Sequence, residues 1–268
     1  MADLNPISLW RRLLALPNES RTKTIAVAFL VSLFSALLVS GAAVTLKPIQ
    51  EANRAAERQA RMDAMIAALP GLAEILKTSG ADTLETRIID LDTGLEAEGV
   101  DPASFDARAA ASDPQTSIAL LPDIDIAGIG RRGNLAQIHI LKDGDDLSLV
   151  ILPVSAAGYA STIHAYLALE GDLNTVAALT ITEQRETPGL GARIEEAAWQ
   201  ALWPGKQIAD ANGEIRLAVV RGGAVSEYEV DGITGATRTG NAVTNMIGFW
   251  MGEHGYGPLL DNLRAGRL

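Results

Sequence analysis

The feature that most constrains this chain is a long uncharged apolar run near its N-terminus. Residues Thr24 to Leu46 form 23 consecutive positions without a charge, bracketed by Lys23 and Lys47. At about 1.5 Å per helical residue the run reaches roughly 35 Å, enough to cross a hydrocarbon core of about 30 Å. A secretory signal peptide has a shorter apolar region, of about 7–15 residues, and a buried core helix is rarely so free of charge. The run therefore predicts a single transmembrane helix in contact with a lipid bilayer.

Charge alone does not orient this helix. Four basic residues precede the run and four lie within the twenty residues after it, so the positive-inside rule favours neither orientation. Residues 1–23 carry +2 of the chain's net charge of −11, which leaves −13 on the remainder. Such an acidic remainder repels phosphates, so we expect no nucleic-acid partner and no large domain lying flat on anionic lipid.

The composition also excludes several kinds of chemistry. The chain has no cysteine and three histidines, which stand far apart at 139, 164 and 254. Disulfides, Cys-ligated zinc, protein-held iron–sulfur clusters and thiol nucleophiles are thereby excluded, and no histidines have the spacing of a metal box. We predict no metal site and no catalytic residue.

Beyond the apolar run, helix and strand patterns follow one another. Helices are expected over residues 50–69, 102–111, 192–203 and 234–252, and residues 113–133 are expected to form a loop. Strands are expected over 87–91, 135–140 and 147–152 (a hairpin), 165–170 and 176–183 (a second pair), 214–220 and 226–230. This order predicts an α+β domain with a largely antiparallel sheet. The expected organisation is an N-terminus over 1–23, a transmembrane helix over 24–46, a connecting helix over 47–80 and a domain over 81–268.

The stretch from Asp231 to Thr237, DGITGAT, carries the clearest chemical signal. It follows an expected strand and opens an expected helix, with Gly232 and Gly235 permitting tight turns and Thr234 as a candidate N-cap. Free N–H groups and the positive end of the helix dipole bind anions, so these residues predict a phosphate-binding turn. A plain glycine-rich turn capped by threonine is the alternative interpretation.

This stretch is similar to the flavinylation signature Asp-x-x-Ser/Thr-Gly-Ala-Thr, in which FMN is joined through its phosphate to the final threonine. Three further stretches support the resemblance, namely Glu186–Gly191 (ETPGLG), Leu167–Glu170 (LALE) and Phe249–Leu260 (FWMGEHGYGPLL). Together with the single N-terminal helix they resemble the C subunit of the sodium-translocating NADH:quinone oxidoreductases, over most of the chain.

The resemblance implies an FMN-binding domain with FMN held covalently, as a phosphoester of Thr237. The other cofactor-binding residues that it implies are Asp231, Gly232, Thr234, Gly235 and Ala236 in the signature, Thr187, Pro188, Gly189, Leu190 and Gly191 in a flavin-side loop, and Gly158 and Tyr159. At these last two the chain departs from the family's Gly-Leu-Trp turn. Loop amides are expected to bond the flavin ring and Leu190 to cover one face of it. Asp231 has two open roles, assisting attachment or capping a turn.

The implied function is electron relay between redox centres of a sodium-pumping NADH:quinone reductase, with no complete activity in this chain alone. The implied partners are the other membrane and peripheral subunits and a flavin transferase that takes FMN from FAD, since no His or Lys adjoins Thr237 to activate its hydroxyl. The implied location is the bacterial inner membrane, single-pass, with the large domain in the periplasm. Two alternatives remain: the G subunit of the related Rnf ferredoxin:NAD complex, and a membrane-anchored FMN-binding sensory domain.

Overall fold

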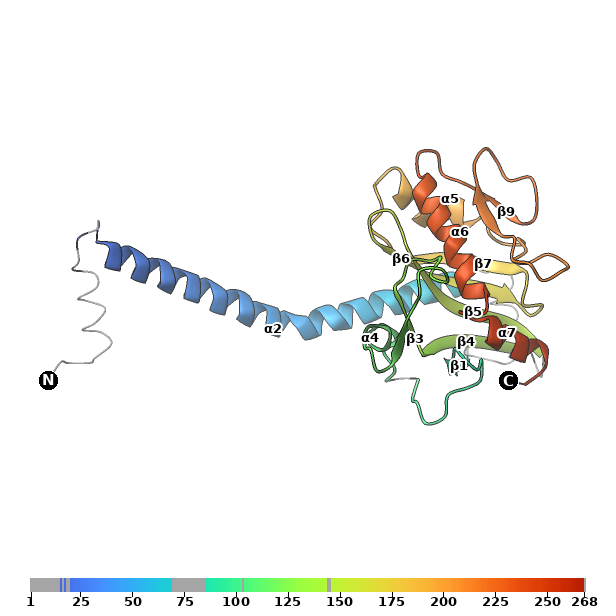
Figure 1. Cartoon of the computed structure of the whole chain (residues 1–268), viewed down its shortest axis with the longest axis horizontal. Helices are drawn as coiled ribbons and strands as arrows, with labels where there is room; N and C mark the ends of the chain where they lie inside the picture. The colour runs from blue at the N-terminus through green and yellow to red at the C-terminus, as the bar shows by residue number, and fades with distance from the viewer. Residues whose placement is uncertain are drawn as a thin grey trace. The chain divides into compact units, whose positions relative to one another are not determined.

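The chain combines a long N-terminal helix with a sheet-based domain (Figure 1). A computed structural model describes residues 15, 17, 20–68, 85–102, 104–143 and 146–267. Contacts within the chain divide it into two units, Met1–Ala60 and Arg61–Leu268.

Helix α2, Arg21–Ala68, contains the apolar run. Its segment Lys23–Pro48 has a mean hydropathy of 2.3, and among the described residues it is the one helical segment long and apolar enough to cross a membrane. Large apolar side chains are exposed along it, including Phe29 and Phe34 at 64% and 65%. Pro48 lies inside α2, so the predicted transmembrane helix and the helix predicted after Pro48 form one continuous element. A proline removes one backbone hydrogen bond, and the helix continues past it here. The rest of the predicted connecting segment, from residue 69, lies outside the described residues.

The second unit is built mainly from strands. In chain order its elements are β1 (Glu85–Asp90), α4 (Ala107–Ser112), β2 (Ser117–Ala119), β3 (Arg131–Gly133), β4 (Leu135–Asp143), β5 (Asp146–Ala157), β6 (Thr162–Glu170), β7 (Val176–Glu183), the 3₁₀-helix η1 (Gly191–Glu195), α5 (Ala197–Gln200), β8 (Ala218–Val220), β9 (Glu229–Asp231), α6 (Thr237–Met251) and α7 (Gly257–Arg264).

Five strands form the main sheet, in the order β1-β4-β5-β6-β7, and every neighbouring pair is antiparallel. The predicted α+β class with a largely antiparallel sheet is confirmed, as are the two predicted strand pairs. These pairs were predictable because β-branched and apolar residues dominate each strand and few residues separate the two strands of a pair. Two small sheets, β2-β3 and β8-β9, complete the domain.

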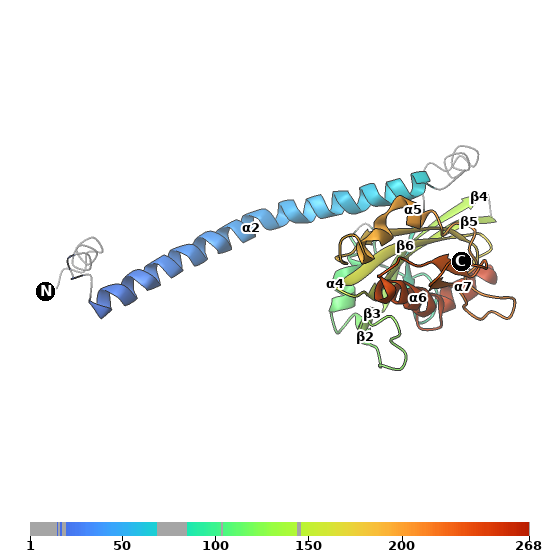
Figure 2. The same ribbon diagram turned by 90° about the horizontal axis from the view of Figure 1, so that it is seen from above.

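Helix α6 lies with α7 against one face of this sheet (Figure 2). Its residues Val243, Met246 and Ile247 have no exposed surface, and their i, i+3, i+4 spacing places them on one helical face. Near the end of α6, the Trp250 indole N–H donates to the Ser155 carbonyl of β5 over 2.8 Å. The helix is therefore fixed to the sheet by both apolar packing and a directed hydrogen bond.

Hydrogen bonds join the C-terminal tail to the rest of the domain. The buried Tyr256 hydroxyl donates to the Pro153 carbonyl over 2.8 Å, and the Asn262 amide donates to the Thr93 carbonyl over 2.9 Å. Gly94 has φ +68°, and a Cβ there would lie 2.2 Å from the Pro258 carbonyl carbon. The tail thus closes over the β1–β4 side of the sheet, and only glycine at position 94 leaves room for it.

The prediction of one regular helix over 192–203 is wrong. The structure has η1 and then the single turn α5, because Glu196 between them is extended, with φ −64° and ψ 131°. The helix predicted over 102–111 begins later, at Ala107, where the Asp106 carboxylate caps the N–H groups of Arg108 and Ala109.

Other boundaries also differ from the predictions. The expected loop over 113–133 contains the short strands β2 and β3, which pair with each other. The strands expected over 214–220 and 226–230 shorten to β8 and β9, which pair in parallel, so they do not form a hairpin. Short strands of this kind are set by contacts distant in sequence, and periodicity does not reveal them.

We predict that the domain loses stability as the pH falls below 6.5. Burial lowers the pKa of His139 below its ordinary value of 6.5. The Nδ1 atom of its ring lies 3.0 Å from the Thr86 hydroxyl. A histidine whose folded pKa is depressed stabilises the fold above its unfolded pKa, and this contribution is lost as the pH falls toward the folded pKa. Denaturant unfolding at pH 7.5 and 5.5 checks this. His139→Gln should reduce the pH dependence; an unchanged dependence would contradict the prediction.

Candidate functional site

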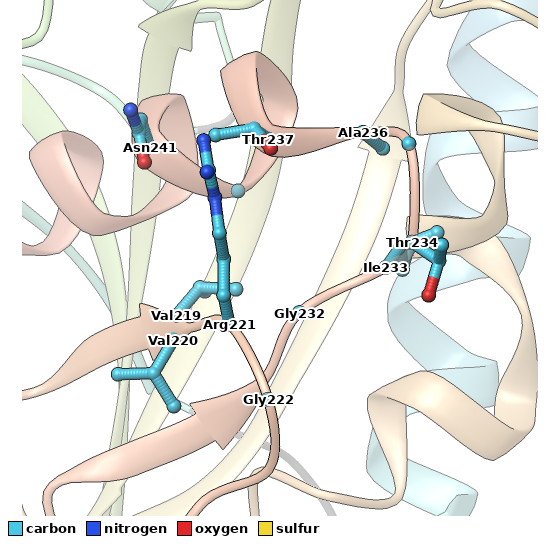
Figure 3. Close-up of a pocket in the computed structure, with 12 residues that line it drawn as sticks. Val219, Val220, Arg221, Gly222, Gly232, Ile233, Thr234, Ala236, Thr237 and Asn241 are labelled. Carbon is cyan, nitrogen blue, oxygen red and sulfur yellow. The ribbon is translucent and has the colours of Figure 1, made fainter.

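A pocket of about 230 Å³ lies where β8, β9 and the beginning of α6 meet (Figure 3). Most residues of the DGITGAT motif line this pocket. The residues that line it are Val219, Val220, Arg221, Gly222, Gly232, Ile233, Thr234, Gly235, Ala236, Thr237, Gly240 and Asn241.

The glycines of the motif allow a close approach to β8. The Gly232 N–H donates to the Val220 carbonyl over 2.8 Å, and a Cβ at Gly232 would lie 2.7 Å from that same oxygen. Gly235 has φ +81°, a left-handed conformation that disfavours side chains. Gly240, one turn into α6, would place a Cβ 3.2 Å from a methyl of Val219. Larger residues would push the motif away from β8 and reshape the pocket.

Helix α6 begins at Thr237 with no side-chain cap. The N-cap position is Ala236, and the prediction that Thr234 caps the helix is wrong. The reason is the left-handed turn at Gly235, which separates Thr234 from the helix; Thr234 is exposed. Within the described part of the chain, the N–H groups of Thr237, Arg238 and Thr239 therefore donate to no acceptor. Free N–H groups at the positive end of a helix dipole form an anion site.

A cation lies at the same place. Arg221 follows β8 immediately, and its side chain extends toward Thr237 and Asn241 (Figure 3). Among the described residues no carboxylate pairs with it. Arg221 could not be identified from the sequence, because it precedes the motif and meets it only through the parallel pairing of β8 with β9.

Asp231, the first residue of the motif, makes its contacts with residues outside the pocket lining. Its carboxylate accepts from the Ala224 N–H, and its carbonyl accepts from the Trp199 indole N–H over 2.8 Å. Of its two possible roles, the geometry favours the cap: the carboxylate closes the turn that leads from β8 to β9. Asp231 does not line the pocket.

The expected flavin-side loop, residues 187–191, lies against the motif. A Cβ at Gly235 would lie 3.0 Å from a methyl of Leu190, whose side chain is 42% exposed. Thr187, Pro188 and Gly189 are exposed, whereas Gly191 is buried. The Leu190 N–H donates to the Thr187 carbonyl over 3.1 Å, so this amide is engaged within the loop. The Leu190 side chain is exposed and so can contact a ligand, and its place against a flavin ring stays a prediction.

The segment Gly158–Tyr159 also lies near the beginning of α6. The Arg238 guanidinium, one residue after Thr237, lies 5.3 Å from the centre of the Tyr159 ring, and Tyr159 is 58% exposed. A cation over an aromatic face is a favourable contact. Of the residues singled out in the sequence, Leu190, Gly191 and Tyr159 thus lie beside the beginning of α6 together with motif residues 232–237, whereas the Asp231 carboxylate does not.

This arrangement suits a ligand that ends in a phosphate. Free N–H groups and Arg221 provide positive charge, Thr237 provides a hydroxyl, and Leu190 and Tyr159 provide exposed apolar and aromatic surface beside them. FMN has a phosphate at one end and a planar ring at the other, so the residues present fit it. None of the twelve pocket-lining residues is His, Lys, Asp or Glu, so the pocket offers no general base of its own.

Comparison with known proteins places this site in a family. The FMN-binding domain family matches residues 158–252, which include all three segments around α6. The C subunit of the Na(+)-translocating NADH-quinone reductase from Vibrio parahaemolyticus is 40% identical over 257 residues, covering 94% of this chain and 98% of that protein. Its counterpart from Pseudomonas aeruginosa is 39% identical, covering 93% and 98%.

The chain belongs to the family of C subunits of the Na(+)-translocating NADH-quinone reductases. The crystal structure of Shewanella oneidensis NqrC agrees, with a TM-score of 0.69 at 32% identity, covering 79% of this chain and 99% of that one. The crystal structure of the corresponding C subunit from Parabacteroides distasonis covers 80% of this chain and 96% of that one, and with a TM-score of 0.57 at 24% identity it supports the fold alone. Near-complete coverage of the relatives from Vibrio and Pseudomonas favours this family over the two alternatives considered from sequence.

Proposed function

We propose that this chain is the electron-relay subunit of a Na(+)-translocating NADH-quinone reductase, with FMN joined covalently through its phosphate to Thr237. The observation that carries the proposal is the uncapped beginning of α6. Thr237 is the first helical residue, three N–H groups around it have no acceptor in the described part of the chain, and Arg221 extends toward it. Family membership and the match to the FMN-binding domain family support the same cofactor.

Attachment would be a group transfer from FAD. The Thr237 oxygen forms a bond to the phosphorus of the FMN half, the phosphoanhydride bond breaks, and AMP leaves with the electron pair of that bond. The hydroxyl proton must go to a base. Because the pocket lining contains no base, a separate flavin transferase supplies it. The helix N–H groups and Arg221 then stabilise the remaining negative charge of the phosphodiester, the N–H groups by roughly 0.3–1 kcal/mol.

Bound FMN supplies the redox chemistry, accepting and donating electrons one or two at a time. This chain's residues hold it. Thr237 prevents its loss, while Leu190 and Tyr159 provide surface against which a ring can rest. The pocket is small and lacks acid–base groups, which suits relay between partner proteins better than reaction with a dissolved substrate. The other subunits of the reductase are therefore the partners that donate and accept electrons.

Helix α2 would anchor the protein in the bacterial inner membrane as a single pass. We place the N-terminus in the cytoplasm and the FMN-binding domain in the periplasm. The apolar segment Lys23–Pro48 supports the anchor, and the orientation rests on the family resemblance, since basic residues are balanced on its two sides.

We expect Thr237→Ala to abolish covalent flavin. The substitution removes the attacking hydroxyl from a half-buried position at the helix start, so the fold should persist. Thr237→Ser should retain part of the flavin, because the hydroxyl remains, and exposed Thr234→Ala should retain all of it. Flavin absorbance of denatured, desalted protein and peptide mapping measure the outcome. Flavin retained by Thr237→Ala, or mapped to Thr234 in the unmutated chain, would contradict the assignment.

Arg221→Gln should slow flavin incorporation by roughly two- to fivefold, the value of one exposed charge pair. Arg221→Lys should restore most of the rate, because a cation remains. The matched control is Arg216→Gln, which removes an exposed arginine paired with Asp210 outside the pocket lining. The assay follows apo-protein treated with FAD and a purified flavin transferase. Equal rates for Arg221→Gln and Arg216→Gln would count against a phosphate contact.

The proposed orientation predicts where a new thiol is reachable. The chain has no cysteine, so Val225→Cys, at a side chain that is 89% exposed, introduces a single one. A membrane-impermeant maleimide should label it in intact spheroplasts. Ser8→Cys is the matched variant on the N-terminal side and should be labelled only after lysis. The reverse pattern would overturn the periplasmic placement.

A further inference from the structure

A buried carboxylate connects the three segments that meet at the site. Glu186, just before the loop 187–191, is 3% exposed. One of its oxygens accepts from the Thr239 hydroxyl over 2.6 Å, and the other accepts from the Ala160 N–H over 2.9 Å. Thr239 belongs to the first turn of α6, and Ala160 to the turn between β5 and β6. The Glu186 side chain, next to the loop 187–191, thus bonds both to the first turn of α6 and to the turn between β5 and β6.

The hydrogen bonds to this carboxylate favour its ionised form despite its burial. Burial alone would raise the pKa of Glu186, but hydrogen bonds from Thr239 and from the backbone N–H groups of Ala160, Tyr159 and Ser161 outweigh it and hold the pKa below its ordinary value. A buried anion is tolerated where its lone pairs are occupied by donors. Each donor therefore matters, because removing one leaves a buried charge only partly satisfied.

The residues around Glu186 are closely packed, with no room for an added side chain at Gly158 or Gly191. A Cβ at Gly191 would lie 2.4 Å from the Thr239 hydroxyl and 2.9 Å from Glu186 itself. A Cβ at Gly158 would lie 2.5 Å from the Glu186 carboxylate. Glycine on both sides lets the loop, the turn and the helix close around the carboxylate. A rearrangement here shifts Leu190 and Tyr159, which are adjacent in sequence to Gly191 and Gly158.

We propose that Glu186 is a positioning residue, whose carboxylate holds the loop 187–191 and the turn 158–161 against the first turn of α6 so that a flavin tethered at Thr237 rests on a preformed surface. The inference rests on the proposed function, because it presumes that tether. A phosphate ester and a ribityl chain are strings of rotatable bonds, so the tether alone does not orient the ring. Orientation must come from the protein surface beside Thr237, and Glu186 fixes that surface without lining the pocket.

Two pairs of variants separate this role from general stabilisation. Thr239→Val keeps the side-chain shape but removes the hydroxyl, whereas Thr239→Ser keeps the hydroxyl. Glu186→Ala removes both links, whereas Glu186→Gln can keep them, since its amide oxygen accepts from Ala160 and its amide nitrogen donates to the Thr239 oxygen. Each variant is made in the full chain, coexpressed with a flavin transferase and purified in detergent.

The readouts are covalent flavin content, flavin fluorescence anisotropy, the flavin midpoint potential and the thermal unfolding midpoint. In Thr239→Val and Glu186→Ala we expect full covalent flavin, loss of most of the anisotropy and a shifted potential. Thr239→Ser and Glu186→Gln should retain the anisotropy of the unmutated protein. If Glu186→Ala does not fold, the Thr239 pair decides.

Two results would overturn the proposal. In the first, folded Thr239→Val keeps the original anisotropy and potential while only its unfolding midpoint falls, as a purely structural role requires. In the second, Glu186→Gln loses as much anisotropy as Glu186→Ala, which would assign the effect to the charge and not to the links. Failure of the underlying function looks different, because the unmutated chain would then carry no covalent flavin at Thr237.

Discussion

The seating of α6 on the five-stranded sheet is the interaction on which the rest of this domain depends. Three fully buried residues on one helical face and the Trp250–Ser155 hydrogen bond fix the helix against β5. The beginning of the helix is thereby fixed as well, and with it Thr237 and its N–H groups. Apolar packing provides most of the energy for this arrangement, and the hydrogen bond adds a directed contact.

Around that helix start, the fold brings together segments that are distant in the sequence. Thr239 in α6 reaches Glu186 over 53 positions, and Trp199 reaches the Asp231 carbonyl over 32. The motif glycine Gly232 allows a further close approach, between the motif and β8, since a side chain there would collide with the Val220 carbonyl. The resulting anion site is open because no side chain caps α6. An uncapped helix is less stable by about 1 kcal/mol, which is consistent with a site kept free for a ligand.

Much of the fold could be predicted from the sequence. The antiparallel strand pairs β4–β5 and β6–β7 follow from alternating or continuous apolar runs separated by short turns. The helical face of α6 follows from its i, i+3, i+4 spacing. The boundaries of η1 and α5 could not be predicted, because one extended residue, Glu196, interrupts an otherwise helical pattern. Neither could the parallel pairing of β8 with β9, since two three-residue strands carry no periodic signal.

The sequence by itself determined the apolar helix near the N-terminus, the antiparallel sheet and the DGITGAT motif, because length, hydrophobicity and glycine spacing act locally along the chain. It did not identify Arg221 as a residue of the pocket lining or Glu186 as a carboxylate that bonds to two other segments, and it misassigned Thr234 as the helix cap. Those points were decided by tertiary structure. Arg221 reaches the motif through strand pairing, Glu186 acquires its partners only when three segments converge, and the left-handed Gly235 moves the helix start to Thr237. Contacts between distant segments depend on how the elements pack, and no local pattern in the sequence encodes that packing.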